Sequence, residues 1–135
     1  MLAVLDPFFW MREKTDVKHE SMLFKIAIGL LSIAVLDGAY LSRLHHWGKR
    51  VPMPLALVHG ILADAGILLL LIGMVQHGVT NALFGSFMIL TFAALSGGKL
   101  FSYHMAKEPL PKRLLHTHIG LALTGYLFLW AHFLH

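Results

Sequence analysis

Four histidines stand at matched heights on two apolar segments of this 135-residue chain. His118 and His132 are 14 residues apart, which on an α-helix is a net rotation of about −40° and a rise of about 21 Å. His59 and His77 are 18 residues apart, which is five whole turns with about zero net rotation. Each pair therefore lies along one face of its helix, and neutral imidazoles are common metal ligands.

Glycines lie on the same two helix faces between the histidines. Gly66 and Gly73 are on the face of one segment, and Gly125 is on that of the other. Missing side chains leave space for a flat ligand, although membrane helices also use small residues simply to pack closely. We favour the first interpretation, which makes these glycines candidate cofactor-binding residues.

The two histidine levels match because both segments run in the same direction through the membrane. His59 and His118 lie near the face that carries the first and third loops, named side A, and His77 and His132 lie near the opposite face, side B. A haem iron can take imidazoles from both faces of its ring. The sequence therefore predicts haem b between the members of each pair, with one or two groups bound and two favoured.

The spacing H-x13-H from His118 to His132, with glycine and alanine on the same face, resembles the helices of transmembrane di-haem cytochromes b. That family includes the small cytochrome b subunits of membrane-bound dehydrogenases and hydrogenases. The resemblance covers residues 54–134 and implies axial ligation by His118 and His132, with His59 and His77 as their partners. It also implies electron transfer across the membrane, often to or from a quinone. The interval from His59 to His77 is one turn longer than the family pattern, and the chain is shorter than most such subunits.

Two other histidines are alternative ligands on side A. His104 lies at the side A end of the third segment. His116 is two residues from His118 and points about 160° away around the helix. Either histidine could replace a side A ligand or hydrogen-bond a haem propionate.

Three charged residues lie within the apolar segments, where an unpaired charge is expensive. Asp37 and Lys99 are both about seven residues from the side A ends of their helices, which predicts an ion pair between them. Asp64 lies deeper in its segment than His59. We expect Asp64 either to form a hydrogen bond between helices or to handle protons near a haem or a quinone.

The composition requires that a membrane-spanning scaffold position these side chains. Hydrophobic residues make up 57% of the chain and charged residues 13%, and the mean hydropathy is +0.69. The chain has no cysteine, which excludes iron–sulfur clusters and thiolate metal sites. A membrane-spanning helix needs about 20 residues, and the apolar stretches that reach about this length are 21–44, 54–75, 79–103 and 114–134.

Short connections predict an all-α, up-down-up-down four-helix bundle over residues 21–135, preceded by an interfacial segment over residues 1–20. Six lysines and arginines flank the helices on side A and four on side B, which predicts cytoplasmic side A loops and external termini. We expect a prokaryotic inner membrane as the location. No internal repeat is predicted.

We therefore expect an electron-transfer subunit rather than a self-contained enzyme, because the chain has no room for a substrate-oxidising domain. The expected partners are membrane lipid, other membrane or peripheral redox subunits and a possible quinone, with no nucleic acid. The alternatives are a haem-free structural subunit of a membrane complex and a histidine-lined metal-ion transporter.

Overall fold

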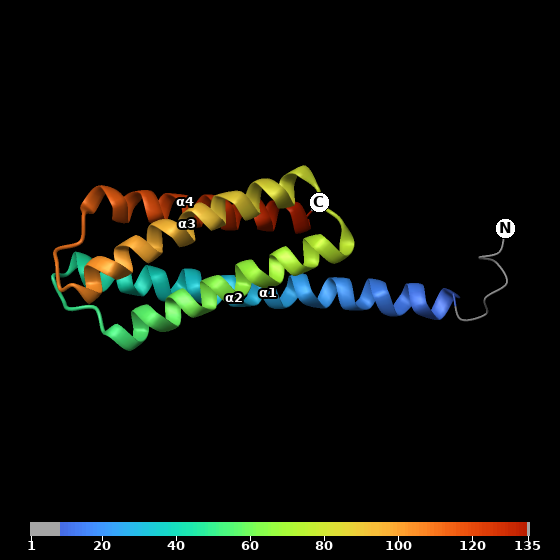
Figure 1. The fold of residues 1–135 in the computed structure, drawn as a ribbon, viewed down its shortest axis with the longest axis horizontal. Coiled ribbons are helices and arrows are strands. Elements are labelled where there is room, and N and C mark those ends of the chain that lie inside the picture. The colour runs from blue at the N-terminus through green and yellow to red at the C-terminus, as the bar shows by residue number, and fades with distance from the viewer. Residues whose placement is uncertain (1–8, 135) are drawn as a thin grey trace.

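The computed structural model describes the backbone of residues 9–134 and the side chains of residues 22–134. Four helices pack as an up-down bundle (Figure 1), which confirms the all-α fold expected from the sequence. The helices are α1 (Phe9–His46), α2 (Met53–His77), α3 (Asn81–Met105) and α4 (Lys112–Leu134).

Each helix contains a segment that is long and apolar enough to cross a membrane. These spans have mean hydropathies between 1.3 and 2.3, and their bounds are Met22–His46, Met53–His77, Asn81–Met105 and Lys112–Leu134. Large apolar side chains face outward along them; Leu36 is 71% exposed and Val75 is 76% exposed. Lipid is the solvent that covers such a surface without cost. The chain is an integral membrane protein with four spans.

The interfacial segment predicted for residues 1–20 overlaps the start of α1. This helix is 38 residues long, and the part before its membrane span continues past the end of the other helices (Figure 1). Residues 1–8 and His135 lie outside the described part of the chain. Whether the segment lies in the interface stays a prediction.

Capping residues set the ends of the helices that carry the histidines. Pro52 precedes α2 in an extended conformation, and a proline at a helix start loses no hydrogen bond because that amide has no partner in the helix. Gly78 ends α2 with a φ of 99°, and its N–H donates to the Met74 carbonyl. The Thr80 hydroxyl accepts a hydrogen bond from the Leu83 N–H and so caps the start of α3.

Two helical hairpins, α1 with α2 and α3 with α4, repeat one another at an offset of 59 residues. In the first loop, the Gly48 N–H donates to the His45 carbonyl at 3.0 Å. In the third loop, the Lys107 N–H donates to the His104 carbonyl at 3.2 Å. Gly48 and Lys107 also share a positive φ, at 67° and 56°. A left-handed conformation costs a lysine about 1–2 kcal/mol, so the loop geometry imposes it.

Both hairpins run in the same direction, since α1 and α3 lead toward side A and α2 and α4 lead back. The halves are therefore related by an approximate two-fold rotation about an axis along the bundle. Such a rotation keeps equivalent residues at the same depth in the membrane. This is why the histidine of α2 and that of α4 reach one level.

The sequence analysis did not find a repeat strong enough to propose. The repeat is hard to detect in the sequence because most residues that match at this offset are leucine, alanine or glycine, which are common in any membrane helix. Matching pairs within the helices include Leu31 and Leu90, Ala34 and Ala93, Gly38 and Gly97, His59 and His118, and Gly66 and Gly125.

Two of the glycines predicted to border a haem lie at contacts within the hairpins. A Cβ atom at Gly66 would lie 2.7 Å from Leu31 Cγ, and one at Gly125 would lie 2.8 Å from Leu90 Cγ. These glycines therefore make room for a leucine of the neighbouring helix. Such close approach favours association in lipid, where van der Waals packing replaces the hydrophobic effect.

Gly66→Ala and Gly125→Ala should each destabilise the protein by about 1–3 kcal/mol, because the added methyl group overlaps a leucine branch point. The measurement is thermal unfolding in detergent micelles. Gly120→Ala is the matched control, since a Cβ atom there meets nothing within 4 Å. Equal stability of the Gly66 variant and this control would contradict the packing role.

Candidate functional site

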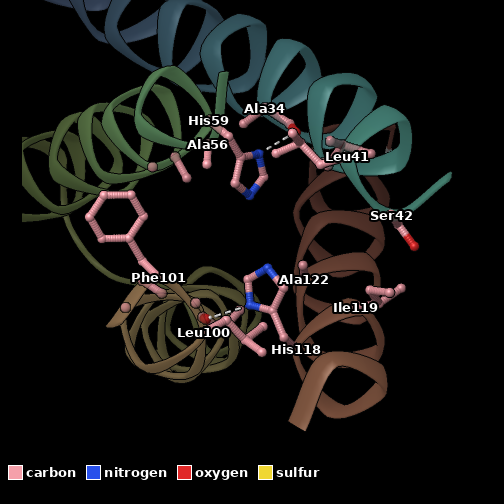
Figure 2. A pocket seen from close by; sticks show the side chains of 18 of the residues that line it. Ala34, Leu41, Ser42, Ala56, His59, Leu100, Phe101, His118, Ile119 and Ala122 are labelled. Atoms are coloured by element: carbon pink, nitrogen blue, oxygen red, sulfur yellow. Dashed lines mark hydrogen bonds between the residues drawn. The ribbon is translucent and has the colours of Figure 1, made fainter. Parts of the chain in front are cut away.

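His59 and His118 face each other across the centre of the bundle. Their ring centroids are 6.1 Å apart and their planes are inclined at 79°. His59 extends from α2 and His118 from α4, and Figure 2 shows one nitrogen of each ring pointing into the space between them. The structure therefore brings together the two histidines predicted as the side A pair.

A hydrogen bond to a backbone carbonyl fixes the proton on each ring. His59 Nδ1 lies 3.0 Å from the Ala34 carbonyl oxygen, and His118 Nδ1 lies 2.9 Å from that of Ala93. A carbonyl oxygen can only accept, so Nδ1 of a neutral ring carries the hydrogen and donates it. Nε2 is then left with a lone pair directed into the bundle, which is the form of imidazole that binds metals.

Glycines let the rings approach the neighbouring helix this closely. A Cβ atom at Gly38 would lie 2.7 Å from His59 Cε1, and one at Gly97 would lie 2.9 Å from His118 Cε1. The sequence analysis missed both glycines as parts of the site. The signal that could have found them is a glycine 21 residues before each of the two histidines.

His59 and His118 line a partly open cavity of about 660 Å³, and residues from all four helices contribute to its walls. Its walls are mainly small or aliphatic and include Ala63 and Ala122, an equivalent pair of the repeat. The volume is in the range of pockets that hold small molecules or cofactors, about 300–1,000 Å³. At the inner end, the hydroxyl of Tyr126 lies 2.7 Å from Ser32 Oγ and so links the two hairpins.

A second equivalent pair of histidines lines the same cavity nearer side A. His45 and His104 both contribute to its wall, so the predicted alternative ligand His104 does belong to the site. His116, the other alternative, is exposed and does not line the cavity. Its direction away from His118 follows from their spacing of two residues on one helix.

Cations near side A stack on aromatic rings. The guanidinium of Arg43 lies 4.8 Å from the ring centroid of Trp47, and the Lys99 ammonium lies 5.6 Å from that of Tyr103. Each contact is a cation–π interaction. These groups place positive charge around the side A end of the bundle.

An aromatic cluster occupies the side B end, where the second histidine pair was predicted. The ring centroid of Phe24 is 6.4 Å from that of His77 and 5.4 Å from that of Phe133. The ring centroids of His132 and Phe133 are 5.1 Å apart. Neither His77 nor His132 lines the cavity that contains the side A pair. The repeat is also broken here, because Gly73 stands where the second half has His132.

Gly73 is the third glycine predicted to border a haem. The same aromatic cluster occupies the space beside it. A Cβ atom at this position would lie 2.8 Å from Phe24 Cε1. Phe24 is 7% exposed and belongs to the core of the bundle. The open side of Gly73 is thus taken by a side chain of α1.

The predicted ion pair between Asp37 and Lys99 is not formed among the described side chains. Asp37 Oδ2 is buried and has no hydrogen-bond partner within the described residues, whereas Lys99 is exposed beside Tyr103. The Asp37 carboxyl group thus points into the protein, whereas Lys99 lies on its surface. Equal depth in the membrane was therefore not enough to predict a contact between them. Asp64 is exposed in the middle of α2 and borders the cavity.

The chain was compared with models of protein families, with curated proteins and with solved structures. No match was found in any of the three comparisons. The resemblance to di-haem cytochromes b therefore depends on the histidine and glycine spacing alone. The structure establishes a four-span helical membrane protein with a histidine-lined cavity.

The ring tautomers can be tested directly. We expect both His59 and His118 to be protonated at Nδ1 and not at Nε2 in the neutral protein, because each Nδ1 faces a carbonyl acceptor. Nitrogen-15 NMR of ring-labelled protein distinguishes the two forms. His116, which is exposed, serves as the reference ring. Protonation of His118 at Nε2 would contradict the geometry described above.

Proposed function

We propose that this protein is a membrane b-type cytochrome that binds haem b between His59 and His118. The observation that carries the proposal is the pair of Nε2 lone pairs, from α2 and α4, that face one cavity. An imidazole nitrogen binds a metal at about 2 Å, so two rings on opposite sides of one ion would have centroids about 6 Å apart. The observed separation of 6.1 Å fits this value.

The remaining parts of the site support the same proposal. A second bond from Nδ1 to a carbonyl is the usual arrangement behind a ligating histidine, since it fixes the ring and raises its basicity. The apolar cavity walls suit a macrocycle, and cations at side A suit its carboxylates. His45 and His104, which line the cavity nearer that end, would hydrogen-bond such carboxylates.

Haem held in this way would supply one-electron transfer, because two protein ligands leave no open position for a substrate. His59 and His118 hold and orient the group, and the apolar walls exclude water from it. The haem proposed here is the side A group. A second haem at His77 and His132 stays a sequence prediction, and the Phe24 cluster does not favour it.

A groove on the lipid-facing side of the bundle suggests where electrons enter or leave. It has a volume of about 420 Å³, lies between α2 and α3, and shares Asp64 with the main cavity. Thr91 also lines it. A groove that opens to lipid and carries a carboxyl group suits a quinone as the electron partner. Further subunits of a redox complex are the other proposed source or acceptor of electrons.

The alternatives receive less support. A histidine-lined metal-ion path requires successive clusters of ligands, and the described residues contain no group of three or more metal-ligating side chains. A haem-free structural subunit does not require the two Nε2 atoms to share a cavity. Both alternatives remain outcomes of the experiment below.

The decisive experiment is an optical spectrum of the purified protein, oxidised and then reduced with dithionite. We expect a b-type α band, and we expect His59→Ala and His118→Ala each to lose at least about tenfold in haem content because both axial bonds are needed. His116→Ala is the matched control and should keep the band. A protein without the band would refute the cytochrome proposal, and full haem retention in His118→Ala would refute the ligand assignment.

Filling the cavity tests the position of the cofactor without removing a ligand. Ala63→Phe and Ala122→Phe, at equivalent positions of the wall, should each lower haem content several-fold because the added ring occupies the space of the macrocycle. Leu127→Phe is the control, since Leu127 is 63% exposed and does not line the cavity. Haem per protein is measured by pyridine haemochrome. Unchanged haem content in both alanine variants would place the cofactor elsewhere.

A further inference from the structure

The internal repeat shows where the surroundings of the two facing histidines differ. Around His118 the neighbouring helix supplies a carbonyl at Ala93, a hydroxyl at Ser96 and a glycine at Gly97. The equivalent positions around His59 are Ala34, Asp37 and Gly38. The carbonyl and the glycine are thus repeated, whereas the polar side chain is not.

Ser96 defines what a side chain at this position can do. Its hydroxyl donates to the Ala93 carbonyl at 2.7 Å and lies 3.2 Å from His118 Nδ1. The Nδ1 hydrogen of His118 is therefore shared between a carbonyl oxygen and a neutral hydroxyl. Both acceptors belong to α3, the partner of α4 in the second hairpin.

Asp37 is the residue of the first hairpin that corresponds to Ser96 in the repeat. It follows Ala34 by three residues and precedes Gly38 by one, as Ser96 follows Ala93 and precedes Gly97. Its Oδ2 atom is buried and hydrogen-bonds to none of the described residues. A carboxyl group inside a membrane bundle is expensive to maintain, and such groups mark functional sites.

We infer that Asp37 sets the reduction potential of the centre held by His59 and His118, which makes the two axial ligands electronically different. The inference rests on the proposed haem function. A negative charge near this centre would stabilise its more positive, oxidised form and so lower the potential. The neutral hydroxyl behind His118 provides no such charge. Asp37 acts through His59 and is a positioning residue.

The test is a spectroelectrochemical titration of the full-length, haem-loaded protein. In Asp37→Ser and in Asp37→Asn we expect the ratio of reduced to oxidised haem at a fixed potential to rise about tenfold or more, which is about 59 mV for a one-electron couple. The electron comes from the electrode through mediators and converts ferric to ferrous haem. Ser96→Asp should shift the ratio in the opposite direction.

The two halves provide a matched control. The double variant Asp37→Ser with Ser96→Asp moves the carboxyl group from one ligand to the other, and its potential should return close to that of the wild type. A residue with a purely structural role would not give this restoration. Glu108→Gln, which removes an exposed charge in the third loop, should leave the potential nearly unchanged.

Three other results would each contradict either the proposed function or the role of Asp37. A wild-type protein without haem refutes the proposed function and this inference with it. Full haem content with an unchanged potential in both Asp37 variants refutes this inference alone. Loss of haem from Asp37→Ser also refutes it, because that variant gives His59 the surroundings that His118 already has.

Discussion

The hydrogen bond from each histidine Nδ1 to a carbonyl of the neighbouring helix is the interaction on which the site depends. A histidine side chain within a membrane bundle needs a partner for its N–H group, and α1 and α3 supply one through Ala34 and Ala93. Each bond lies within one hairpin and needs a glycine to let the ring approach. Because Nδ1 is satisfied in this way, Nε2 stays available, and each hairpin contributes one imidazole with fixed orientation.

The parallel repeat explains how two such imidazoles meet. Hairpins that run in the same direction place His59 and His118 at one depth, and a two-fold arrangement turns their Nε2 atoms toward the common axis. An inverted repeat would have put them at opposite faces of the membrane. The site therefore belongs to the contact between hairpins, which the hydrogen bond between Ser32 and Tyr126 reinforces.

Positions where the two halves of the repeat differ make side B unlike side A and the first hairpin unlike the second. At side B, Gly73 replaces a histidine and Phe24 fills the space beside it, so that end is packed while the side A end is hollow. In the middle of the membrane, Asp64 stands where the second half has Leu123, so the carboxyl group that borders the groove between α2 and α3 has no counterpart in the second half. A duplicated scaffold thus carries an asymmetric cavity.

In the sequence, the lengths of the apolar stretches determined the four spans, and the short connections determined their up-down order. Helical periodicity then placed His59 and His118 at a shared level. It fixes the height and angle of a side chain on its own helix. The partners of those side chains depend on how neighbouring helices cross, which no single-helix pattern contains. Only the tertiary structure could therefore show that Gly66 and Gly125 receive leucines, that Gly38 and Gly97 receive the histidine rings, and that Asp37 faces the interior without Lys99.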